Sequence, residues 1–118
     1  MKINIATAPV SWGVLMKDTP NVPPYHVVLD QIQEAGYTGT ELGPYGYLPV
    51  DIPKLSGELE RRGLSLISAF TIFNFLEAKG DEIVYREALE TLQVLSAMKC
   101  KYLVLSDALF VVENRAQR

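Results

Sequence analysis

A junction at which a helix ends and a strand begins recurs along this chain, and it constrains the fold more than any other feature. The first copy is Ala35-Gly36-Tyr37-Thr38 and the second is Arg62-Gly63-Leu64-Ser65. A third is Lys99-Cys100-Lys101-Tyr102, in which Cys100 takes the place expected for glycine. Glycine suits the left-handed backbone conformation that ends many helices. The recurrence therefore predicts strands that alternate with helices.

Apolar patterns between these junctions predict four strands and three helices. The first strand is predicted over residues 3–8, where β-branched and small residues precede Pro9. Later strands are predicted over residues 38–42, 64–70 and 102–105, with helices between residues 25 and 36, between 51 and 63, and from 81 onward. Pro24 and Asp51 are of the types that open helices.

The third predicted helix has the clearest division into two sides. Its apolar residues recur at helical spacing on one side: Tyr85, Ala88, Leu89, Leu92 and Leu95. Its charged residues mark the solvated side: Glu82, Arg86, Glu87 and Glu90. A helix with this pattern is expected to pack its apolar side on a sheet.

The alternation of strands and helices predicts an α/β fold with a parallel sheet and right-handed crossovers. An open doubly wound sheet and a closed barrel share this signature. A nucleotide-binding doubly wound sheet needs a glycine-rich turn after its first strand, and residues 9–13 do not supply one. We therefore predict a (βα)n half-barrel of order βαβαβαβ, with strand order 1-2-3-4 and the helices on the convex side.

Composition limits the classes of partner. The chain has 118 residues, 48% of them hydrophobic and 21% charged, which is typical of a globular domain. It contains no apolar run of membrane-spanning length and its first residues do not resemble a signal peptide. The net charge of −3 argues against a nucleic-acid-binding surface. A single cysteine, Cys100, fits a reducing compartment, so a cytoplasmic location is expected.

Two segments carry a resemblance to a known superfamily. IATAPVSWG at residues 5–13 and AGYTGTELGP at residues 35–44 resemble the first strand and the first helix-to-strand junction of the inosose dehydratase branch of xylose isomerase-like TIM barrels. Residues 64–70 and 102–107 resemble the third and fourth strands of that group less distinctively. The resemblance implies that residues 1–118 are the N-terminal half of a TIM-barrel domain, with residues 110–118 as a polar tail.

The resemblance also implies an activity. Members of the superfamily are sugar isomerases, epimerases or inosose dehydratases, in which a divalent metal polarises an oxygen while carboxylates move a proton next to a carbonyl. Their metal ligands lie on later strands. We therefore expect a divalent metal in a full-length parent and none bound to this chain. Because a complete barrel needs about 250 residues, the chain is expected to be a fragment, a truncated product or one part of a barrel assembled from several chains.

Four residues that follow or end strands are the candidate substrate-binding residues: Ser11, Trp12, Glu41 and Asp107. Glu41 is also the candidate catalytic carboxylate, and the alternative is that it forms a salt bridge at the end of the strand. Trp12 is of the type that stacks on a sugar, or it forms a hydrophobic lid. Asp107 is an acceptor for hydroxyl groups or a turn residue. Carboxyl ends of parallel strands meet on one face, so we expect these residues to share a rim.

Two further residues and two rival functions complete the expectations. His26 is expected at the surface and Cys100 as a buried structural thiol. An apurinic endonuclease-like barrel is disfavoured because the chain has a single histidine. A non-catalytic half-barrel that serves binding or assembly stays open. Unpaired edges of a half-barrel favour self-association.

Overall fold

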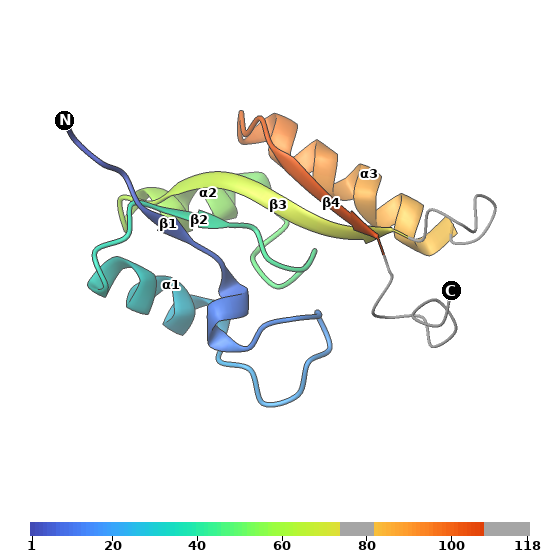
Figure 1. The fold of residues 1–118 in the computed structure, drawn as a ribbon, viewed down its shortest axis with the longest axis horizontal. Helices are drawn as coiled ribbons and strands as arrows, with labels where there is room; N and C mark the ends of the chain where they lie inside the picture. The colour runs from blue at the N-terminus through green and yellow to red at the C-terminus, as the bar shows by residue number, and fades with distance from the viewer. Residues whose placement is uncertain (74–81, 108–118) are drawn as a thin grey trace.

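Strands and helices alternate along the whole described chain (Figure 1). The computed structural model describes residues 1–73 and 82–107. The strands are β1 (Ala6–Thr7), β2 (Gly39–Glu41), β3 (Ser65–Phe73) and β4 (Leu103–Asp107), and the helices are the 3-10 helix η1 (Pro9–Trp12), α1 (Tyr25–Glu34), α2 (Ile52–Glu60) and α3 (Glu82–Ala97). The predicted polar tail at 110–118 lies outside the described residues. No helix in the described ranges is both long enough and apolar enough to cross a membrane.

The four strands form one parallel sheet in the order β1-β2-β3-β4. The predicted strand order is therefore confirmed. A doubly wound sheet reverses its order at a switch point, and the described strands contain no such reversal. The arrangement is that expected for half of a (βα)n fold.

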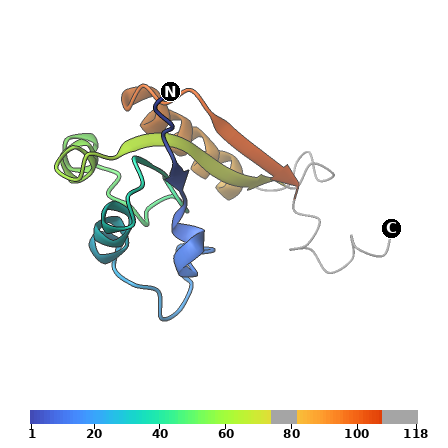
Figure 2. The same ribbon diagram turned by 60° about the vertical axis from the view of Figure 1, so that its left-hand side comes forward.

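All three α-helices cover the same face of the sheet. One core cluster contains residues from each helix together with residues of the sheet and its loops: Val28, Leu29, Ile32, Leu42, Leu48, Leu55, Leu59, Leu64, Ala69, Val94 and Leu95. Figure 2, turned by 60°, shows the twist of the sheet over these helices. The opposite face, which we call the open face, is not covered by any described helix.

Local signals explain where α2 begins and where each α-helix ends. The Asp51 side chain accepts a hydrogen bond from the Lys54 backbone N–H at 3.0 Å and caps α2. Gly36 and Gly63 follow α1 and α2 with φ angles of 85° and 66°. At the third junction the left-handed residue is Lys99, with φ 55°, and not Cys100 as the sequence comparison predicted. The left-handed residue of the third junction therefore lies one position earlier in the sequence than the first two junctions predicted.

Helix α3 is rotated relative to the prediction. Among the α3 residues whose burial is described, Ala88, Thr91, Val94 and Leu95 are buried, whereas Tyr85, Leu89 and Leu92 are 62%, 44% and 44% exposed. Glu87 and Glu90 lie near Tyr45 in the loop after β2. Burial raises the pKa of Tyr45, and the charges of Glu90 and Glu87 raise that pKa further. This side of α3 therefore faces the preceding strand–helix unit, and the stripe of exposed apolar residues faces away from it.

Candidate functional site

A hydrogen bond between two neighbouring strands forms the centre of the candidate site. Glu41 ends β2, and its Oε1 accepts a hydrogen bond from the Ser68 hydroxyl on β3 at 2.8 Å. Ser68 is only 6% exposed, while Glu41 is half-buried. A carboxylate has two acceptor oxygens, so the bond to Ser68 leaves the group with further capacity to accept hydrogen bonds from a ligand.

A β-bulge brings these two residues together. The register pairs Gly39 with Ser65 and Thr40 with Leu66, and then skips a residue so that Glu41 opposes Ser68. Ile67 is the extra residue. Bulges reverse the alternation of side chains along a strand and often redirect a side chain at a functional site. Without the bulge Glu41 would oppose Ile67, and the Ser68 side chain would point to the helix-covered face.

Gly39 makes room for this bulge. A Cβ atom at position 39 would lie 2.8 Å from Ile67 Cγ2, 3.1 Å from the Ser65 carbonyl oxygen and 3.2 Å from the Ala6 Cβ. The first distance is shorter than carbon atoms tolerate. A side chain at position 39 would therefore force its neighbours to shift, so glycine is favoured there by the lack of space.

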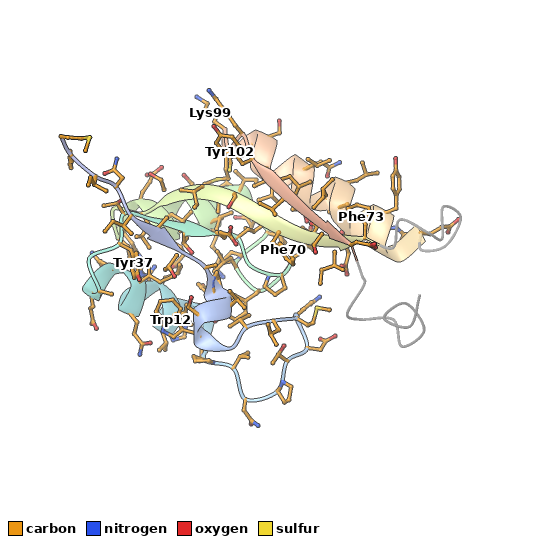
Figure 3. The ribbon with its side chains drawn as sticks, viewed as in Figure 1. Trp12, Tyr37, Phe70, Phe73, Lys99 and Tyr102 are labelled. Carbon is orange, nitrogen blue, oxygen red and sulfur yellow. The ribbon has the colours of Figure 1, made fainter. Side chains whose placement is uncertain are left out.

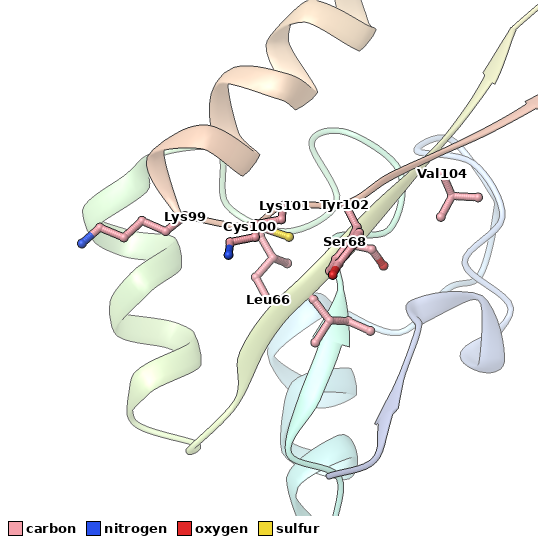
Figure 4. A pocket seen from close by; sticks show the side chains of 8 residues that line it. Leu66, Ser68, Lys99, Cys100, Lys101, Tyr102 and Val104 are labelled. Carbon is pink, nitrogen blue, oxygen red and sulfur yellow. The ribbon is translucent and has the colours of Figure 1, made fainter.

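A shallow hollow of about 610 Å³ lies beside Ser68 on the strands β3 and β4 (Figure 4). Its lining combines aliphatic, aromatic and polar side chains: Leu66, Ile67, Ser68, Lys99, Cys100, Lys101, Tyr102 and Val104. Lys99 extends away from the centre of this group (Figure 4). Ser68 thus contacts Glu41 and also lines the hollow, which makes it the residue common to both.

Ser11 lies in η1, directly after β1. Its hydroxyl is 3.3 Å from the hydroxyl of Thr7, which ends β1. The loop that follows β2 lies against η1, since a Cβ at Gly43 would be 3.0 Å from Pro9 Cγ. The structure therefore brings the segment that carries Ser11 close to the segment that follows Glu41. Whether Ser11 binds substrate stays a prediction.

Trp12 is directed toward a helix. Its indole N–H donates a hydrogen bond to Gln31 Oε1 on α1 at 2.6 Å, and its ring packs against the core cluster. Figure 3 shows the side chain between η1 and α1. This geometry matches the hydrophobic-lid interpretation of Trp12 more closely than that of a wall for a sugar on the open face.

Asp107 lies far from Glu41 along the sheet. The register pairs Ala69 with Leu103 and Phe73 with Asp107, whereas Glu41 pairs with Ser68. Asp107 is thus five residues beyond the level of Glu41, or about 16 Å at roughly 3.3 Å per residue. Side-chain alternation from the core residue Ala69 also puts Asp107 on the helix-covered face. The structure does not bring Asp107 and Glu41 together.

Tyr102, the residue directly before β4, is level with Glu41. It directly precedes Leu103, the partner of Ala69, and alternation places its side chain on the open face with Val104. Tyr102 is exposed and lines the hollow. Sequence reasoning missed both Tyr102 and Ser68 as candidate site residues, because apolar residues occur on both faces of these strands and the pattern does not distinguish one face from the other.

His26 and Cys100 take no part in the pair formed by Glu41 and Ser68. His26 is exposed on α1, as expected, with its ring 5.7 Å from that of Tyr25. Cys100 is half-buried rather than fully buried, because one side packs on the core cluster while the other lines the hollow. The expectation of a buried structural thiol is therefore met only in part.

A divalent metal does not fit the described residues. No group of three or more histidine, cysteine, aspartate or glutamate side chains in residues 1–73 and 82–107 is arranged to hold one. Glu41 has a serine hydroxyl as its neighbour, whereas hard cations such as Mg²⁺ are bound through several carboxylate or carbonyl oxygens. The metal implied by the resemblance would need ligands from elsewhere.

Comparisons with models of protein families, with curated proteins and with solved structures gave no match to this chain. The functional assignment therefore rests on the geometry of the open face and on the motifs in residues 5–13 and 35–44.

Proposed function

We propose that this chain forms part of a sugar or polyol isomerase, epimerase or inosose dehydratase, and that it binds the hydroxyl groups of the substrate. The observation that carries the proposal is the Glu41 carboxylate, which ends β2 and is held by the buried hydroxyl of Ser68. The resemblance in the motifs at residues 5–13 and 35–44 supports the same class of substrate.

The chemistry of the pair suits a hydroxyl-rich ligand. A carboxylate accepts hydrogen bonds from hydroxyl groups, and a bond to a charged group contributes about 1.5–3 kcal/mol. The Tyr102 ring lines the adjacent hollow and provides an apolar surface for the C–H face of a sugar ring. The described residues thus supply recognition, while a proton transfer next to a carbonyl requires further groups.

A binding measurement tests this proposal. Calorimetric titration of the chain with inosose, xylose and myo-inositol should show saturable binding of at least one, and Glu41→Gln should weaken it at least about tenfold, or roughly 1.4 kcal/mol. Glu34→Gln is the matched control, because Glu34 is exposed at the end of α1. Failure of all three ligands to bind, or equal affinity in Glu41→Gln, would overturn the proposal.

A second candidate function is a non-catalytic half-barrel that serves assembly. The observation in its favour is the exposed apolar surface of the open face on β3 and β4, which includes Phe70 and Val104. An apolar surface of this kind is typical of a face that contacts another protein. Saturable binding of a polyol that depends on Glu41 would distinguish the first function from the second.

A further inference from the structure

We infer that Ser68 is the positioning residue for Glu41, and that the bulge at Ile67 exists in this fold to place the Ser68 hydroxyl on the open face. This inference deepens the proposed function and rests on it for its biological meaning. The effect of Ser68 on the conformation of the Glu41 carboxylate can be measured without a ligand.

The burial of Ser68 makes its hydrogen bond to Glu41 selective. A serine hydroxyl has one hydrogen to donate, and in this structure it is donated to Glu41 Oε1. Since Ser68 is 6% exposed, water competes poorly for that hydrogen. A buried donor without an acceptor is unfavourable, so the hydroxyl keeps Glu41 Oε1 in one place.

The hydrogen bond from Ser68 matters because a free glutamate side chain is flexible. A glutamate side chain has three rotatable bonds and loses much conformational freedom when it is ordered. Glu41 is half-buried and is the last residue of β2. Its own strand therefore fixes its backbone but not the position of its carboxylate. A neighbour that holds one oxygen orders the group before a ligand arrives, and preordered groups bind more tightly.

Three features of the chain combine to produce the contact. Gly39 leaves the space that Ile67 fills, Ile67 supplies the extra residue of the bulge, and Ser68 then opposes Glu41. Ser65, on the same strand before the bulge, is exposed and opposes Gly39. Ser65 is therefore the matched control for Ser68.

Carbon-13 NMR of the Glu41 carboxyl group tests the positioning itself. The resonance is assigned by its loss in Glu41→Gln. Ser68→Ala should shift and broaden this resonance, because the carboxylate loses its donor. Ser68→Thr, which retains the hydroxyl, should restore the wild-type resonance, and Ser65→Ala should leave it unchanged. An unchanged Glu41 resonance in folded Ser68→Ala would overturn the inference, as would equal changes in Ser68→Ala and Ser68→Thr.

Titration with the polyol that binds wild type best then links the position of Glu41 to binding. Ser68→Ala should weaken binding about fivefold to tenfold, with Ser68→Thr and Ser65→Ala close to wild type. If wild type binds no polyol while the NMR result is as expected, the proposed function fails and the positioning role stands. If wild type binds and Ser68→Ala binds equally well, the positioning role in binding fails and the proposed function stands.

Discussion

The guanidinium of Arg62 donates a hydrogen bond from Nε to Oδ1 of Asp30 at 2.6 Å, which joins the end of α2 to α1. Its Nη1 atom donates to Oε2 of Glu58 at 2.6 Å and to the Glu58 carbonyl oxygen at 2.8 Å. The Arg62 side chain is 2% exposed. A buried arginine with these partners connects two helices on the helix-covered face.

Arg62→Ala should therefore destabilise the fold by roughly 1.5–3 kcal/mol, the range for hydrogen bonds to charged groups. The loss stays below that of a fully buried ion pair, because Asp30 is half exposed and water solvates its carboxylate once Arg62 is removed. Urea denaturation measures the change. Arg61→Ala is the control, since Arg61 is exposed and bonds only to Glu58 among the contacts described. Equal stability of the two variants would contradict a structural role for Arg62.

The stability of the chain should also fall in acid through Glu58. Hydrogen bonds from Arg62 and then Arg61 lower the pKa of Glu58 below its ordinary value of 4.5. A carboxyl group whose pKa is lower in the folded state stabilises the fold above its unfolded pKa and loses that contribution as the pH falls through the folded value. The difference in melting temperature between wild type and Glu58→Gln should be largest above pH 4.5 and shrink below it. A difference that is constant with pH would contradict this.

Lys99→Gly should stabilise the chain by about 1 kcal/mol. Lys99 has a left-handed φ of 55° at the end of α3, where α1 and α2 are each followed by a glycine. A side chain in this conformation costs roughly 1–2 kcal/mol, and glycine removes that cost while adding some freedom to the unfolded chain. Lys101→Gly, in the segment between Lys99 and β4 where no positive φ occurs, should not stabilise the chain. Thermal melts of both variants check the prediction, and a lower melting temperature for Lys99→Gly would refute it.

Gly39→Ala should destabilise the chain by about 1–3 kcal/mol, the usual cost of overpacking, because the new methyl group would lie 2.8 Å from Ile67 Cγ2. Shortening the neighbour in Gly39→Ala/Ile67→Ala should recover part of the loss, since the two side chains share one space. Gly57→Ala is the control, because a Cβ there meets nothing within 4 Å and lies in a helix. Denaturation midpoints of wild type, Gly39→Ala, Ile67→Ala and the double variant measure the coupling between the two positions, and strictly additive effects would exclude the clash.

The chain is predicted to self-associate through the outer edges of β1 and β4, which end the described sheet. Exposed apolar residues lie near both edges, including Ile5, Val104 and Leu105. In sedimentation velocity, the average sedimentation coefficient should therefore rise with protein concentration in the micromolar range. Leu105→Lys should weaken the association, because a charge on an edge strand opposes pairing. Leu15→Lys, in the exposed loop after η1, should not. Monomers at all concentrations would contradict the prediction.

The order of the strands follows from local signals. At each junction, near Gly36, Gly63 and Lys99, four or five residues separate the end of a helix from the start of a strand. Parallel strands joined by right-handed crossovers become neighbours. These are properties of short segments. The sequence therefore predicted the alternation, the parallel pairing and the helices on one face without reference to distant contacts.

The faces of the strands and of α3 are decided only by the tertiary structure. Leu103, Val104 and Leu105 are all apolar, so no alternation shows which of them meets the core. Helix α3 has more apolar residues than its contact with the sheet covers, and packing selects Thr91 and Val94 over Leu89 and Leu92 for burial.

The candidate site shows the same division. Glu41 could be proposed from the sequence because it lies at the end of a predicted strand, which is a property of its own neighbourhood in the chain. Its partner Ser68 lies 27 residues away and reaches it only through the bulge at Ile67. The bulge needs the space that Gly39 leaves beside the Ile67 side chain, and that space forms only when β2 and β3 lie next to each other. Register is set when strands pair and side chains fill the space between them, and a single segment carries no record of it.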